Sequence, residues 1–102
     1  MKTTTNIFLY DDQIDLGVGQ FAAVTGFKLV ASGRNEIPEA IMTDEGVVYG
    51  YIHEIDTGIL EMLDTFYGLG VDLHQRVLVT ATLQGGTKVS TYMYEFNYVE
   101  VA

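Results

Sequence analysis

The chain has 102 residues, 48% of them apolar, with 14 acidic against 5 basic side chains, a net charge of −9 and no cysteine. This length predicts one domain over residues 1–102, and the apolar content excludes a disordered acidic tail. The negative charge argues against nucleic acid or an anionic membrane as partner, and the lack of cysteine excludes disulfides, thiolate chemistry and cysteine–zinc sites.

The N-terminus lacks the apolar run of a signal peptide, and no apolar segment approaches the roughly 20 residues that cross a bilayer. We therefore expect a cytoplasmic protein. The first predicted strand is the run Asn-Ile-Phe-Leu-Tyr at residues 6–10. Because this run is apolar at both odd and even positions, it is typical of a central strand covered on both faces. It is followed by the acidic segment 11–15 and by a loop with Gly17 and Gly19.

Residues 24–31 predict a second strand, followed by a turn at 32–35. A short segment begins near Pro38 and runs to Met42, and the sequence Thr-Asp-Glu-Gly at 43–46 predicts another turn. Residues 47–55 predict a strong strand, rich in valine, tyrosine and isoleucine.

One helix is predicted directly after this strand. Asp56 or Thr57 offers an N-cap oxygen, and Gly68 suits the C-cap because glycine adopts a positive φ at little cost. Apolar residues at the i, i+3, i+4, i+7 spacing predict a single buried face, made of Ile59, Met62, Leu63 and Phe66.

Residues 71–83 alternate between apolar and polar side chains, which predicts a half-buried strand. The polar side includes His74 and Arg76, so we expect an exposed histidine. A turn at 84–87 and a strand at 88–99 with aromatics at every second position complete a hairpin. The predicted fold is α+β, a small mixed β-barrel or curled sheet with one main α-helix and about six strands.

In this order, the segments resemble the γ-glutamylcyclotransferase-like family, also called the AIG2-like family. Its Y-G-(S/T)-L turn corresponds to residues 10–13, and its V-x-G strand to 48–55. Its L-D-x-x-E-G helix end corresponds to 63–68, and its arginine-bearing strand to 74–79. The final strand with an aromatic pair corresponds to 89–97. The resemblance implies a small mixed β-barrel that holds a pocket and converts γ-glutamyl amines to 5-oxoproline.

The resemblance also implies where the chemistry is placed. In the family, backbone N–H groups of the first turn bind the substrate carboxylate, and a glutamate before the final glycine acts as general acid/base. Here Asp11 and Asp12 occupy the turn and would repel an anionic substrate. Tyr67 occupies the glutamate position, and a phenol with an ordinary pKa of about 10 is a poor base at neutral pH. No catalytic residue is therefore assigned, and Glu54 is the candidate substitute acid.

The ligand-binding candidates form one set and the structural candidates another. The first set is Tyr10, Asp11, Asp12, Gln13, Tyr49 and Tyr67. The second is Asp64 and Arg76, expected to pair, with Gly50 and Gly68. For Tyr67 the alternative is an ordinary aromatic at the helix end. For Asp11, Asp12 and Asp15 the alternatives are recognition of a cationic group, an oxygen-ligated metal or a solvated loop.

His53 and His74 lie on separate predicted strands and lack an assignable third ligand, so we expect no metal and no cofactor. Three hypotheses for function remain. The first is a divergent domain without cyclotransferase activity that binds a small molecule or a protein partner through the retained pocket. The second is an active γ-glutamyl amine cyclotransferase with a rearranged general acid/base. The third is an acidic protein-interaction module.

Overall fold

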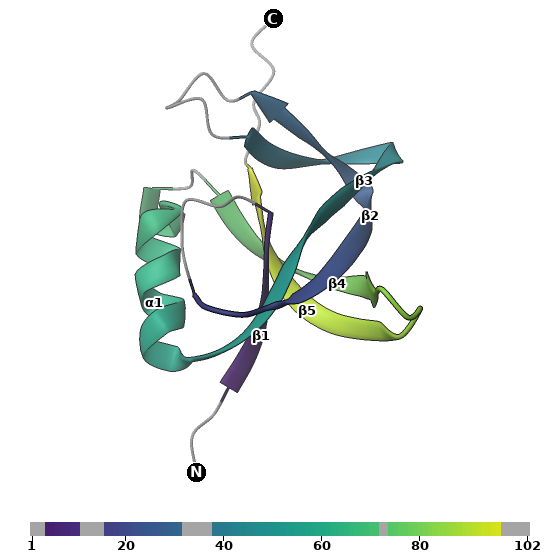
Figure 1. Ribbon diagram of the computed structural model, residues 1–102. Helices are drawn as coiled ribbons and strands as arrows, with labels where there is room; N and C mark the ends of the chain where they lie inside the picture. The colour runs from purple at the N-terminus through teal and green to yellow at the C-terminus, as the bar shows by residue number, and fades with distance from the viewer. Residues whose placement is uncertain (1–3, 11–15, 32–37, 72–73, 97–102) are drawn as a thin grey trace, which may run out of the picture.

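The computed structural model describes residues 4–10, 16–31, 38–71 and 74–96. Predictions for Asp11, Asp12, Gln13 and Asp15, for the turn at 32–35 and for residues 97–99 lie outside these ranges. The elements, shown in Figure 1, are β1 (Thr4–Leu9), β2 (Gln20–Ala31), β3 (Pro38–Asp56), α1 (Thr57–Phe66), a 3-10 helix (Leu69–Val71), β4 (His74–Leu83) and β5 (Lys88–Phe96).

The strands close into a barrel in the order β1-β3-β2-β4-β5. β1 pairs in parallel with β5, and the other pairs are antiparallel, so the barrel is mixed as predicted. α1 connects β3 to the β4–β5 hairpin and lies on one side of the barrel (Figure 1). The expected α+β barrel with one main helix is confirmed for the described residues.

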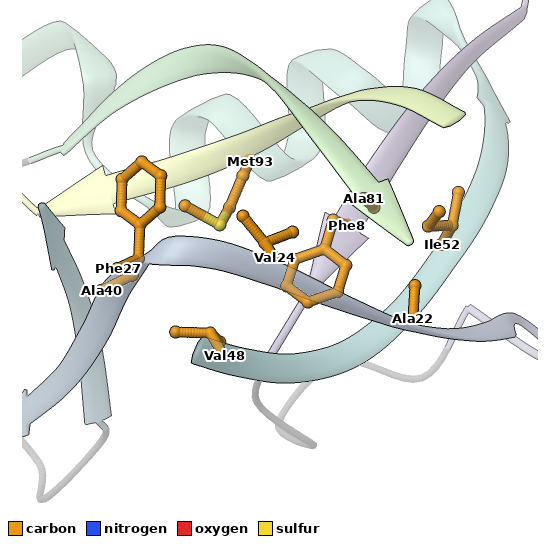
Figure 2. Packing of buried hydrophobic residues seen from close by; sticks show 9 residues of the cluster. All are labelled: Phe8, Ala22, Val24, Phe27, Ala40, Val48, Ile52, Ala81 and Met93. Carbon is orange, nitrogen blue, oxygen red and sulfur yellow. The ribbon is translucent and has the colours of Figure 1, made fainter. Parts of the chain in front are cut away.

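Two apolar clusters meet at β1. Phe8 points into the barrel, whereas Ile7 and Leu9 pack on the outer side, under α1 with Leu63. β1 is thus covered on both faces, as its uninterrupted apolar run predicts. The interior cluster, drawn in Figure 2, draws side chains from all five strands: Phe8, Ala22, Val24, Phe27, Ala40, Val48, Ile52, Ala81 and Met93.

α1 begins at the predicted Asp56 cap, and its C-cap is Tyr67, one residue before the predicted Gly68. Of its predicted buried face, Ile59 and Leu63 are confirmed and Met62 and Phe66 are not. Asp56 Oδ1 accepts a hydrogen bond from the Ile59 amide at 3.0 Å, and Gly68 has φ +71°. Met62 and Phe66 are 57% and 47% exposed. The buried face is instead composed of Ile59, Leu60, Leu63 and Tyr67. The helix carries apolar residues on two sides, and periodicity alone could not select the side that meets the barrel.

β3 is one strand of 19 residues, so the predicted turn at 43–46 and the sixth strand were wrong. The β2–β3 register shifts between Thr25 and Phe27, where Gly26 adopts φ +89°. This bulge bends the ladder without ending it. On β3, opposite the bulge, a Cβ at Gly46 would lie 2.5 Å from the Phe27 carbonyl oxygen. The glycine that suggested a turn therefore allows the backbones of β2 and β3 to approach closely.

The boundaries of three other strands also differ from the prediction. β1 is Thr4–Leu9 and not residues 6–10, so Tyr10 follows the strand. β2 begins at Gln20, four positions before the predicted start at residue 24, and Val71 belongs to the 3-10 helix rather than to β4. The hairpin turn at 84–87 is confirmed: the Leu83 amide donates to the Thr87 carbonyl at 2.8 Å, and Gly86 has φ +95°.

Candidate functional site

Most of the described candidates meet at one end of the barrel, where β1 and β5 finish and β3 and β4 start. The hydroxyl of Tyr10, the residue that follows β1, joins β3 and β5 there. It donates to the Tyr94 carbonyl oxygen on β5 at 3.0 Å and accepts from the Ala40 amide on β3 at 3.3 Å. Because the hydroxyl is both donor and acceptor, it satisfies two backbone groups at once. We call the region of Tyr10, Glu39, Tyr67, His74 and Tyr94 the Tyr10 end.

Tyr67 is 2% exposed and lies among aromatic rings. Its ring stacks on Tyr94, with centroids 4.2 Å apart and planes 12° apart, and meets His74 edge-on at 5.1 Å. These contacts fix the side chain by packing. The position at which the resemblance places a glutamate is therefore filled by a ring built into the core.

His74 is buried, at 2% exposure, and the prediction of an exposed histidine was wrong. Its Nδ1 lies 2.6 Å from the Tyr67 carbonyl oxygen, and its Nε2 contacts Glu39 Oε2. A carbonyl oxygen only accepts, so Nδ1 carries a proton and donates it. A hydrogen bond between Nε2 and the carboxyl group therefore needs one further proton on one of the two side chains.

Glu39 was not identified from the sequence, although it is 1% exposed and central to this contact. It is 35 positions from His74, and no spacing rule connects the two. The sequence signal was limited to an acid placed between Pro38 and an apolar run. Because a buried charge requires a partner, the burial of this segment would have implied one.

Asp64 organises the polar edge of the same cluster. The Arg76 Nη1 lies 3.1 Å from Asp64 Oδ2, so the expected pair is present, and the Tyr94 hydroxyl donates to Asp64 Oδ1 at 2.6 Å. Burial, followed by the hydrogen bond to Asp64 and its charge, raises the pKa of Tyr94 well above its usual value, and Arg76 opposes this shift.

Three other candidates lie apart from the Tyr10 end. Tyr49 is 58% exposed, on the outer side of β3. Glu54 is exposed and is the Cα partner of Asn6, near the start of α1. A helix of this length spans about 15 Å, which separates Glu54 from Tyr67 at the helix end. A Cβ at Gly50 would clash with the Leu9 carbonyl oxygen, so Gly50 serves close strand packing.

The carboxylates near the Tyr10 end all have partners within the described residues. Glu39 contacts His74, and Asp64 binds Arg76 and Tyr94. Glu95 Oε1 accepts a hydrogen bond from Gln75 Nε2 at 2.5 Å. Across the described ranges, no group of three or more histidine, cysteine, aspartate or glutamate side chains is placed to hold a metal. Nor does any helix in those ranges have the length and apolar character needed to cross a membrane.

Comparisons with known proteins agree with this architecture. The chain superposes on a structure titled "Gamma-glutamyl cyclotransferase" with a TM-score of 0.79 and 18% identity, covering 96% of this chain and 69% of that one. For an AIG2-like protein from Mus musculus the TM-score is 0.74, with 23% identity and coverage of 94% and 80%. For a solution structure from Arabidopsis thaliana the values are 0.77, 18%, 94% and 64%, so the chain spans less than two thirds of that protein.

The structural similarities establish the fold, and the family assignment comes from the sequence. No curated protein matches the sequence. The family model described as "Gamma-glutamyl cyclotransferase, AIG2-like" matches residues 7–101, nearly the whole chain. The chain therefore belongs to the gamma-glutamyl cyclotransferase, AIG2-like family.

Proposed function

We propose that this protein is a divergent member of its family that lacks cyclotransferase activity and binds a small molecule or a protein partner through the retained barrel. The observation that carries the proposal is the packing of Tyr67. Release of 5-oxoproline requires a group that takes a proton from the attacking amine and delivers it to the leaving amine. A phenol stacked on Tyr94 and buried to 2% exposure is unsuited to that task.

The positions and hydrogen bonds of the other carboxylates support the same proposal. Glu39 and Asp64 are hydrogen-bonded within the protein, and Glu54 is exposed near the opposite end of α1. Asp11 and Asp12 follow Tyr10 in the sequence and disfavour an anionic ligand. We expect the small molecule to carry a cationic group and to bind near Tyr10. We also propose that the protein is cytoplasmic and that residues 1–102 form one domain.

A second candidate function is favoured by the Glu39–His74 contact. A carboxyl group in hydrogen-bond contact with an imidazole beside Tyr67 offers a proton-transfer pair, such as a rearranged general acid/base would require. Both side chains are shielded from solvent, at 1% and 0% exposure, so a substrate would reach them only after the barrel end opens. This shielding makes loss of activity the preferred proposal.

The test is release of 5-oxoproline from γ-glutamyl dipeptides and γ-glutamyl amines by the purified protein. We expect no turnover above the uncatalysed rate. Turnover that is lost in Glu39→Gln and retained in Glu45→Gln, an exposed acid on the same strand, would establish the second candidate instead. A thermal-shift panel of polyamines and 5-oxoproline tests binding, because ligand at a hundredfold excess over Kd stabilises the fold by about 2.7 kcal/mol.

A further inference from the structure

We propose that the outer side of β2 and β3 is a docking surface for a short basic segment of a partner protein. The surface is built on Phe21, Tyr49 and Tyr51, which we call the aromatic row. It is distinct from the Tyr10 end, so the proposal does not depend on whether cyclotransferase activity has been lost.

The aromatic row is a preformed surface. Phe21 and Tyr51 are Cα partners across β2 and β3, and Tyr49 is the next outward residue along β3. The Phe21 ring is nearly parallel to Tyr49 (4°, centroids 6.0 Å apart) and edge-on to Tyr51 (68°, 5.6 Å). Because the rings contact one another across the strands, little side-chain entropy is lost when a partner binds.

The row is open to solvent although it is apolar. Phe21, Tyr49 and Tyr51 are 42%, 58% and 50% exposed, and Val47, two positions before Tyr49, is 41% exposed. On another side of the barrel the outward apolar residues are covered, since α1 packs over Ile7 and its neighbours on β1 and β5. Contiguous exposed apolar side chains mark interaction sites, and tyrosine and phenylalanine are enriched in interface cores.

The small area of the row and the net charge of the chain argue against a second copy of the chain as its occupant. Three aromatic residues of 150–250 Å² each, about half exposed, offer roughly 300 Å². A stable dimer needs about 800 Å² from each partner. Two copies would also repel, because each carries a net charge of −9. A short segment of another protein matches the available area.

Charge identifies the chemistry of that segment. On β3, the exposed acids Asp44 and Glu45 lie at the end of the row next to Val47, and the chain as a whole carries a net charge of −9. Of the basic side chains in the described ranges, Arg76 is paired with Asp64, whereas Lys28 on β2 and Lys88 at the start of β5 are exposed. Arginine or lysine on the partner would meet the carboxylates of Asp44 and Glu45 at one margin and aromatic faces at the centre, where cation–π contacts add to binding.

The experiment is selection from a display library of random 12-residue peptides against the full chain. We expect enriched peptides to combine arginine or lysine with apolar residues. Binding of the enriched pool should fall about tenfold for the double variant Tyr49→Thr/Tyr51→Thr, since two exposed cation–π contacts are worth about that factor. The matched control is Leu78→Thr, which removes a 65% exposed apolar side chain from β4 and should leave binding unchanged.

A second variant keeps the test decisive if the tyrosine double variant folds poorly. Asp44→Asn/Glu45→Gln leaves the row intact and should weaken binding at low salt, with a smaller difference at high salt. The proposal is overturned if the enriched peptides are neutral or acidic, or if the pool binds the wild type and both double variants equally. A dimer in sedimentation velocity that dissociates in the tyrosine double variant would also overturn it, in favour of a second copy.

Discussion

The Tyr94 hydroxyl combines burial with a hydrogen bond to a carboxylate. Donation to Asp64 at 2.6 Å requires the neutral phenol, and burial disfavours the phenolate. Both effects raise the pKa of Tyr94 in the folded state above the ordinary value of about 10 in the unfolded chain. The contribution to stability is therefore fully present below pH 10 and is lost as the pH rises above 10 towards the folded-state pKa.

We predict that Tyr94→Phe removes a late step from the alkaline absorbance titration of the tyrosines. The wild type should show a phenol that ionises after the exposed ones, and the variant should lack it. The fall in the free energy of unfolding above pH 10, measured in urea, should also become shallower. Tyr49→Phe, at an exposed position, is the control and should leave the late step in place.

Glu39 and His74 are a buried pair whose members depend on each other. Each contacts the other on β3 and β4, two strands that are not neighbours in the barrel. We predict that Glu39→Ala lowers the free energy of unfolding by about 3 kcal/mol, because it leaves the buried Nε2 of His74 without its Glu39 partner. Glu45→Ala, at an exposed position, should change stability by less than about 0.5 kcal/mol.

The double variant Glu39→Ala/His74→Ala distinguishes a coupled pair from two independent packing residues. For a coupled pair, the double variant should lose less stability than the sum of the single losses, by at least about 0.5 kcal/mol. Additive losses in urea unfolding would contradict a direct interaction between Glu39 and His74.

At the scale of elements, the packing of β1 against β3 depends on Gly50. A Cβ at that position would clash with the Leu9 carbonyl oxygen and lie 2.8 Å from the Phe8 ring. We predict that Gly50→Ala destabilises the protein by about 3 kcal/mol, because the backbone must move apart to accept a methyl group. The measurement is the denaturation midpoint in urea.

Gly85 in the β4–β5 turn provides the matched control. A Cβ at Gly85 would have no heavy atom within 4 Å, so Gly85→Ala should change stability by less than about 0.5 kcal/mol. Equal losses in the two variants would mean that backbone freedom of the unfolded chain, and not the Leu9 contact, determines the effect.

Several features of the helix and the strands could be predicted from the sequence because they depend on neighbouring residues. Local signals located the Asp56 cap, the Gly68 terminus and the hairpin turn, because each depends on residues a few positions apart. Alternation likewise directed Val77, Val79 and Ala81 towards the barrel interior. The family resemblance supplied the closed arrangement of strands, which no local pattern encodes.

The failed predictions concern contacts between distant segments. Burial of His74 depends on Glu39, 35 positions earlier, and the buried side of α1 depends on which strands it meets. The turn predicted at 43–46 is overridden by pairing with β2 through a bulge. The ligand-binding roles of Tyr10, Tyr67 and the acidic segment stay predictions.

At the scale of the whole molecule, the parallel pair of β1 and β5 has a kinetic consequence. Ile7 is aligned with Tyr92 and Phe8 with Met93, so the ring of strands is completed by residues from opposite ends of the chain. Contacts of such long sequence separation slow folding, because the entropy of closing the loop is lost before the contacts form. During synthesis, the barrel therefore cannot close until β5 has left the ribosome and can pair with β1.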